Sequence, residues 1–202
     1  MDIMKKENLW PTPVWYFDID PTEIDFDKIK NEIYKIKAVD SGKLASNYLG
    51  WQSNDIYVDK NTDTETNKLM LLIENQGSNC FDDIGAKSSL SRKISNYWIN
   101  VNKKNDLNYP HSHPESSLSG CVYIECGENS GSIRFYRNAA ETFCYSEILG
   151  FENKDSNPYG FEYVYFKPIK YRVLIFPAFL MHMVEPNKAD EDRISIAFNF
   201  YK

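Results

Sequence analysis

The sequence predicts a mainly β fold in which two or so packing helices precede an antiparallel β core. Short apolar segments follow one another from about residue 95, and Gly, Asn and Pro turns separate them. Aromatic residues make up 15% of the 202 residues, and aromatic side chains pack well on the pleated surface of a sheet. Short strands at this spacing are typical of a barrel or sandwich. We expect one domain, 1–202, with helical support at about 20–85 and a β core at about 95–202.

Before the β core, the sequence predicts an extended arm and two helices. The apolar segment 9–18 contains two prolines, which favour an edge strand or an arm over a central strand. Asp25 is a candidate helix cap, and isoleucines follow it at helical spacing, at Ile29, Ile33 and Ile36. A second helix is expected at about 65–77, with Gly77 as its end.

Seven segments are expected to form the strands of the β core. They are bounded by turn residues, and those with alternating apolar and polar side chains fit a strand that has one buried face. The segments are 97–102, 119–125, 132–136, 161–166, 172–177, 179–185 and 193–200.

The charge balance argues against non-specific binding to nucleic acid. The formal net charge is −6, whereas such binding depends on Lys and Arg that neutralise phosphates. The basic residues between Lys87 and Lys104 are interpreted as a solvated strand surface. No signal peptide or membrane-spanning apolar run is visible, and no CxxC pair occurs among Cys80, Cys121, Cys126 and Cys144. We therefore expect a cytoplasmic protein with reduced thiols.

The three histidines of the chain are arranged as a metal site would need. His111 and His113 are two residues apart, so on a strand they would face the same side, and Glu115 could join them. His182 lies far along the chain at the end of an apolar segment. Any one histidine is more often a side chain satisfied by hydrogen bonds. Two ligands close in sequence and a third far away suit a facial metal triad with open positions, which is typical of non-haem Fe(II) oxygenases.

Arg193 begins a strand-like segment whose two faces differ. Alternation places Arg193, Ser195, Ala197 and Asn199 on one face and four apolar residues on the other. The small residues beside Arg193 suit the lining of a cavity, where a buried guanidinium needs an anionic partner. A dicarboxylate ligand would be such a partner, and an acidic side chain of the chain itself is an equally good one.

The motifs around these residues resemble the Fe(II)- and 2-oxoglutarate-dependent oxygenase superfamily, and more narrowly a family of such oxygenases in bacteria and marine phages. The shared pattern is HxHP, SG, FP, H and RxS, in that order. The resemblance runs nearly end to end, and its central and C-terminal motifs are the specific ones. The matching segments are LWPTPVW near the start, GWQS at 50–53, W-x-N-x-N at 98–102, HSHPESSLSGCVYI at 111–124, SGSIRF at 130–135 and LIFPAFLMHMVEPN…RISIAFN at 174–199.

This resemblance implies a double-stranded β-helix, the jelly roll of cupin-like proteins. It implies Fe(II) held by the HxH segment and His182, and 2-oxoglutarate held by Arg193 with help from Ser195. Tyr123 is expected to add a hydrogen bond to this co-substrate. The implied reaction uses O₂ to hydroxylate an unidentified small molecule or protein side chain and releases succinate and CO₂. A phage-encoded member would act in the host cytoplasm, and the aromatic N-terminal arm offers a surface for a homodimer.

The third iron ligand is where the chain departs from the superfamily, which usually has HxD or HxE. In one interpretation His111, His113 and His182 all bind iron. In the other, the ligands are His113, Glu115 and His182, and His111 supports them. We favour three histidines because the matching family segment reads HxHP.

Two other functions are consistent with the sequence. The first is a cupin-like metal dioxygenase that does not use 2-oxoglutarate, for which Arg193 would be dispensable. The second is a non-catalytic β-helix that serves as a binding or structural module. The missing HxD motif, and Tyr171 at a position where glycine is common in the family, leave room for this second function.

Overall fold

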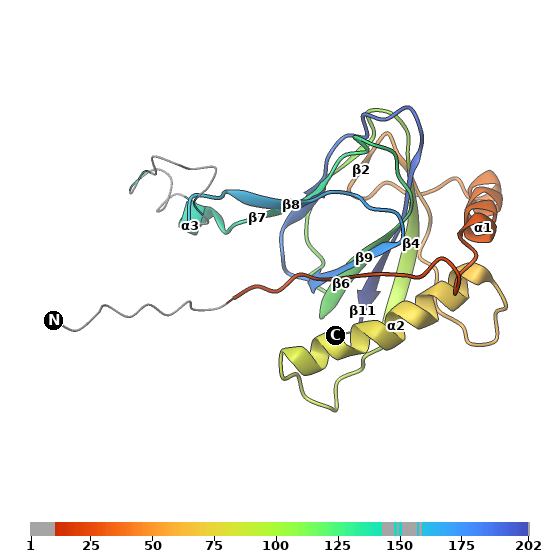
Figure 1. The fold of residues 1–202 in the computed structure, drawn as a ribbon, viewed down its shortest axis with the longest axis horizontal. Helices are drawn as coiled ribbons and strands as arrows, with labels where there is room; N and C mark the ends of the chain where they lie inside the picture. Colours follow the sequence, from red (N-terminus) through yellow and green to blue (C-terminus); the bar gives the residue numbers. More distant parts are fainter. Residues whose placement is uncertain (1–10, 143–147, 149, 151–156, 158, 202) are drawn as a thin grey trace.

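Two antiparallel sheets face each other in the computed structural model, which describes residues 11–142, 148, 150, 157 and 159–201 (Figure 1). One sheet has six strands in the order β1-β9-β6-β11-β4-β3, and the other has five in the order β2-β5-β10-β7-β8. The six-stranded sheet comprises β1 (Trp15–Asp18), β3 (Trp51–Gln52), β4 (Ile94–Asn102), β6 (Leu118–Glu125), β9 (Arg172–Pro177) and β11 (Arg193–Phe200). The five-stranded sheet comprises β2 (Asn47–Tyr48), β5 (Leu107–His111), β7 (Ile133–Tyr136), β8 (Tyr163–Phe166) and β10 (His182–Val184).

Two long helices cover the outer face of the six-stranded sheet (Figure 1). Helix α1 (Phe26–Val39) begins after Asp25, whose carboxylate accepts a hydrogen bond from the Lys28 N–H at 2.9 Å. This confirms Asp25 as the helix cap, because a capping side chain satisfies a free N–H of the first turn. Helix α2 (Glu65–Asp83) begins after Thr64, and a short helix α3 (Ala139–Thr142) follows β7.

The main hydrophobic core lies between these helices and the six-stranded sheet. Fully buried helix residues meet the apolar face of β11 in one cluster. Its members include Ile29, Ile33, Leu69, Met70 and Ile73 from the helices, and Ile194, Ile196, Phe198 and Phe200 from β11. A smaller cluster lies between the two sheets and includes Phe135 and Phe176. The helices therefore fix the outer face of the sheet and leave its inner face to form a cavity.

The expected end of the second helix at Gly77 is wrong. Helix α2 continues to Asp83, and Gly77 is a buried residue in its interior. A Cβ at this position would lie 2.6 Å from Cζ of Phe200 and 3.1 Å from Cδ1 of Ile175. Glycine is present because the helix lies against the sheet here, and packing outweighs its low helix propensity.

The N-terminal arm and the turn before β9 match the expectations only in part. Strand β1 is an edge strand that pairs with β9, as the prolines predicted. Tyr171 has a φ of 69°, a conformation that favours glycine, and its ring stacks on Phe26 at a centroid distance of 3.8 Å. The stacking offers a contact that glycine would lack.

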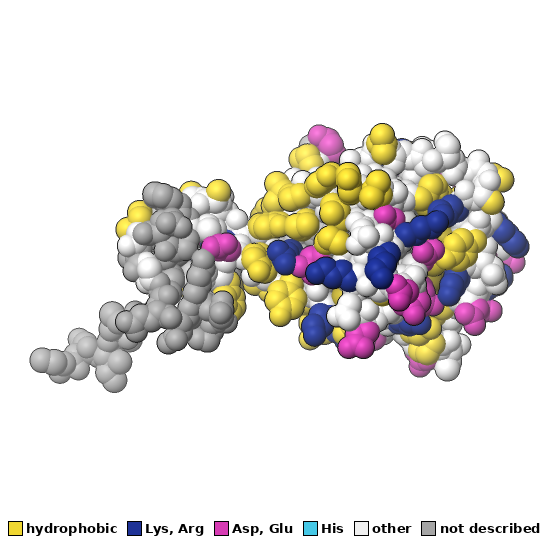
Figure 2. Space-filling model, turned by 90° about the horizontal axis from the view of Figure 1, so that it is seen from above, with side chains coloured by type: hydrophobic (Ala, Val, Ile, Leu, Met, Phe, Trp, Pro, Cys, Tyr) yellow, Lys and Arg dark blue, Asp and Glu magenta, His cyan; other side chains and the backbone are white. Residues whose placement is uncertain are grey.

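The face shown in Figure 2 carries charges of both signs. Basic and acidic side chains are interspersed on the face in Figure 2, beside a broad group of hydrophobic side chains. This face therefore lacks the single-signed basic surface that phosphate binding requires. Among the described residues, no helix combines the length and apolarity of a membrane span.

We predict that Gly77→Val lowers the free energy of unfolding by about 1–3 kcal/mol, because the added methyl groups overpack the contact with Phe200. Urea unfolding measures this loss. The matched control is Gln76→Val on the exposed side of the same helix turn, which tests valine's helix propensity alone. Equal losses in the two variants would contradict the packing explanation.

Candidate metal centre and co-substrate pocket

Pairing of two short strands brings the distant histidines together. His111 is the last residue of β5, His182 is the first of β10, and the two are direct partners in the five-stranded sheet. His113 lies just after β5, and its N–H donates a hydrogen bond to the carbonyl of Ala178 at 2.8 Å. One ligand atom from each histidine lies within 4.8 Å of the other two. The turn, and not a continuous strand, thus places His113 beside His111.

Backbone hydrogen bonds orient two of the three imidazoles. Nδ1 of His111 lies 2.6 Å from the carbonyl of Tyr109, and Nδ1 of His182 lies 2.8 Å from the carbonyl of Leu180. A carbonyl only accepts, so each Nδ1 donates and each Nε2 keeps a lone pair for a metal. Nε2 of His111 also lies 3.5 Å from the hydroxyl of Ser46, which lines the same cavity.

Burial keeps the three imidazoles neutral. Burial, together with a smaller effect of the neighbouring His111, lowers the pKa of His113 to about 4 and the pKa of His182 to about 3. The pKa of His111 is also lowered by burial, although its bond to the Tyr109 carbonyl opposes the shift. Neutral imidazole is the form that binds metals, so the cluster is prepared for a cation.

Glu115 does not belong to this cluster. It lies in the turn after His113, its residue is exposed, and the group of ligand atoms within 4.8 Å contains only the histidines. The structure therefore brings together the first of the two ligand sets expected from the sequence, and leaves Glu115 outside it.

Arg193 lies in the same cavity as the histidines, and its guanidinium is only partly satisfied. The residue is 1% exposed. Its Nη1 donates to the backbone carbonyls of Ser130, Gly131 and Glu185, the last at 2.9 Å. Its Nη2 is buried without a hydrogen-bond partner, and no carboxylate of the described residues forms an ion pair with Arg193. Burial disfavours the charged guanidinium and so lowers its pKa. An anionic ligand would stabilise the charged form.

Gly131 allows this arrangement of carbonyls around Arg193. It has a φ of 83°, and a Cβ there would lie 2.5 Å from the Glu185 carbonyl and 2.9 Å from Nη1 of Arg193. A larger residue would push apart the groups that hold the guanidinium.

The other residues expected to hold a co-substrate also line this cavity. Ser195 follows Arg193 on the inner face of β11 and is paired with Tyr123 on β6. Burial raises the pKa of Tyr123 well above its usual value, so its phenol is neutral. Burial likewise raises the pKa of the neighbouring Cys121 thiol to about 12.

Several cavity residues were missed in the sequence. They are Ser46, Trp98, Asn100, Asn102 and Asn108. The only signal was the W-x-N-x-N motif, in which alternation places Trp98, Asn100 and Asn102 on one face of β4.

We predict that the metal-free protein loses stability as the pH falls from about 6.5 towards 4. In the unfolded chain an imidazole has a pKa of about 6.5, whereas the folded values for His113 and His182 are about 4 and 3. The unfolded state therefore binds protons first, and stability present above pH 6.5 is lost on acidification. Urea unfolding with a chelator, between pH 7.5 and 5, measures the slope. The variant His113→Gln should show a shallower decline, and an unchanged slope would contradict the prediction.

Comparison with solved structures shows the same fold. A prolyl-4-hydroxylase from Pseudomonas putida has a TM-score of 0.62 at 10% identity, covering 95% of this chain and 93% of that chain. A viral collagen prolyl hydroxylase from Paramecium Bursaria Chlorella virus-1, solved with 2-oxoglutarate, has a TM-score of 0.56 at 13% identity, covering 93% and 94%. HygX from Streptomyces hygroscopicus, solved with nickel and 2-oxoglutarate, has a TM-score of 0.56 at 10% identity, covering 94% and 83%. These likenesses confirm the double-stranded β-helix.

Comparison with sequences identifies the family. A search of curated proteins found no significant match. The family model described as "Putative 2OG-Fe(II) oxygenase" matches residues 96–199, which is more than half of the chain. The matched region contains all three histidines and Arg193. This confirms the expected oxygenase class. The chain belongs to the 2OG-Fe(II) oxygenase family and is a 2-oxoglutarate-dependent oxygenase.

Proposed function

We propose that His111, His113 and His182 bind Fe(II), that Arg193 binds the distal carboxylate of 2-oxoglutarate, and that the protein thereby oxidises an organic substrate with O₂. The observation that carries this proposal is the unpartnered Nη2 of Arg193, buried in the same cavity as three neutral imidazoles. The three histidines alone, or the buried guanidinium alone, would be a less specific sign of a 2-oxoglutarate site. Together they match the two ends of a metal-chelating dicarboxylate.

The histidine cluster fits Fe(II) by its chemistry. Three imidazole nitrogens within 4.8 Å of one another suit a first-row divalent metal, and a protein triad leaves coordination positions for other ligands. Bound Fe(II) would supply the activation of O₂ that side chains cannot. The backbone bonds from Nδ1 of His111 and His182 would hold these rings in one orientation as ligands.

Arg193 would fix the other end of the co-substrate. Its Nη1 is held by backbone carbonyls, so the direction of Nη2 is set before any ligand binds. A carboxylate that accepts from Nη2 would neutralise the buried charge and orient the keto acid along the cavity. Ser195 and Tyr123 are the nearby hydroxyls proposed to add hydrogen bonds.

Apolar side chains from both sheets would keep bulk water from this cavity. Ile133, Phe176 and Val184 line it together with the polar residues. A dry surround strengthens the interaction between Arg193 and a carboxylate. The hydroxylated substrate would be either a small molecule or a protein side chain, and succinate and CO₂ would be the other products.

The ligand set can be tested by metal binding. We expect Glu115→Gln to bind Fe(II), or Mn(II) as an air-stable probe, as tightly as the wild type, because Glu115 lies outside the cluster. His111→Gln should bind the metal more weakly than the wild type. The loss of affinity should exceed about 100-fold, because mutation of a residue that only hydrogen-bonds to a ligand costs about 10- to 100-fold. Equilibrium dialysis measures both affinities. If Glu115→Gln loses the metal and His111→Gln retains it, the set of His113, Glu115 and His182 replaces ours.

The function is tested by succinate formation from 2-oxoglutarate. Anaerobically purified, Fe(II)-loaded wild type should form succinate when O₂ is admitted, and His182→Ala should form none. Arg193→Gln should raise the 2-oxoglutarate concentration needed for half-maximal rate about 10- to 100-fold, as loss of a hydrogen bond to a charged group would.

The matched control for this assay is Arg172→Gln. Arg172 also begins a strand, but it pairs with Asp18 at the sheet edge, and it is not among the residues that line the cavity. Its variant should retain wild-type kinetics. Iron-loaded wild type that neither forms succinate nor binds 2-oxoglutarate would overturn the proposal.

A further inference from the structure

The inner face of β4 presents a row of polar residues to the cavity. Asn102 is the register partner of Arg193 on β11, Asn100 is the partner of Ser195, and Trp98 is the partner of Ala197. All six residues line the cavity. The row therefore runs beside β11 from the guanidinium to Trp98, whose ring lies 5.5 Å from that of His113.

The two asparagine side chains of this row are buried without partners. Asn100 is 6% exposed and Asn102 is 1% exposed. Oδ1 of Asn100 and Nδ2 of Asn102 are buried atoms with no hydrogen bond, and neither amide bonds to any described residue. A buried amide normally has at least one hydrogen-bond partner. The unpaired atoms of Asn100 and Asn102, on the strand next to the unpaired Nη2 of Arg193, therefore require an explanation.

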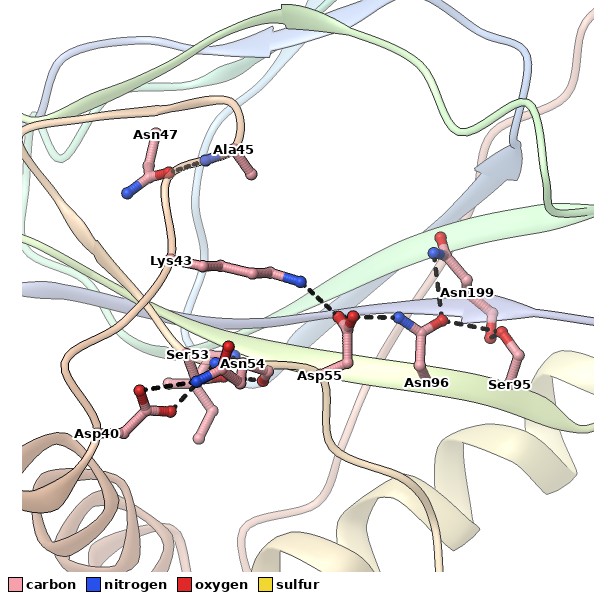
Figure 3. Close-up of polar contacts among 11 residues, drawn as sticks. Asp40, Lys43, Ala45, Asn47, Ser53, Asn54, Asp55, Ser95, Asn96 and Asn199 are labelled. Carbon is pink, nitrogen blue, oxygen red and sulfur yellow. Dashed lines mark hydrogen bonds and ion pairs between the residues drawn. The ribbon is translucent and has the colours of Figure 1, made fainter.

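Two other strand asparagines, one from each sheet, have hydrogen-bond partners for their side chains. Asn96 lies on the same face of β4, and its amide donates to Asp55 at 3.2 Å (Figure 3). Its Oδ1 accepts from Ser95 at 2.9 Å and from Asn199 at 3.4 Å (Figure 3). Asn108, which lines the cavity from β5, donates to Ser46 at 3.3 Å. Among the cavity-lining asparagines, the unpaired amide atoms thus belong to Asn100 and Asn102, and the other unpaired amide among the described residues of the six-stranded sheet is that of Gln52, the β3 partner of Asn100.

The chemistry of this stretch defines its ligand. Arg193 offers a cationic donor, and each amide can present its NH₂ by rotation about χ2. Donors around one cation suit an anion that carries several acceptor oxygens. A keto dicarboxylate has acceptors at both ends, and this reading rests on the proposed function of the cavity.

We propose that Asn102 and Asn100 are further ligands of 2-oxoglutarate. Asn102 shares the distal carboxylate with Arg193, and Asn100 donates to the keto-acid end, nearer the histidines. The five residues from Trp98 to Asn102 span about 13 Å of strand, which is longer than an extended five-carbon keto acid. The W-x-N-x-N motif is then a co-substrate motif.

Affinity for 2-oxoglutarate tests this proposal without turnover. Calorimetry on Mn(II)-loaded protein should show binding weakened about 10- to 100-fold in Asn102→Ala and in Asn100→Ala. Arg193→Gln and Asn102→Ala should be non-additive when combined, because they act on one carboxylate. Asn96→Ala, on the same strand face but outside the cavity lining, is the matched control and should bind as the wild type.

The melting temperature of Asn102→Ala separates a ligand role from a structural one. Because Nδ2 of Asn102 is buried without a partner, its removal should not lower the melting temperature of the ligand-free protein, whereas 2-oxoglutarate affinity should fall. A structural role alone would lower both. If both alanine variants bind within twofold of the wild type while Arg193→Gln is weakened, this inference is overturned and the proposed function stands. Wild type that fails to bind 2-oxoglutarate would overturn the proposed function itself.

Discussion

The two faces of β11 are the constraint on which both the core and the site depend. Its outward side chains are fully buried beneath the helices, and each contributes about 1.5–3 kcal/mol by leaving water. Its inward side chains, Arg193 and Ser195, line the cavity. A slip of one residue would exchange the faces and place the guanidinium among Ile29 and Ile33. The apolar face therefore fixes the register, and with it the position of the buried charge.

Local patterns predicted those parts of the fold and site that depend on short-range physics. The strands at 172–177 and 193–200 were predicted at their observed bounds because alternation and flanking turns mark them. Asp25 was predicted as a cap because its role needs only an N–H three residues away. His182 could be connected to His111 only through the wide spacing that a facial triad requires. The pairing of β5 with β10 supplies that contact in space.

Features that depend on packing between distant segments were not predictable. Gly77 has the sequence signature of a helix end, and only the position of Phe200 explains its place inside α2. His113 was expected on a strand, whereas a turn held by the Ala178 carbonyl places it in the cluster. The sequence did not show that the side-chain amides of Asn100 and Asn102 lack hydrogen-bond partners, because pairing of an amide depends on its neighbours in other strands.

The polar cavity has a thermodynamic consequence for the whole protein. Each buried polar group without a partner costs about 1–3 kcal/mol, and Arg193, Asn100 and Asn102 all carry such groups on one sheet face. A typical domain is stable by only about 5–15 kcal/mol, so this cost is a substantial part of the whole. Packing of α1 and α2 on the opposite face of the same strands offsets it. A ligand that satisfies these groups binds only the folded state, so co-substrate binding and stability of the sheet are linked through the same residues.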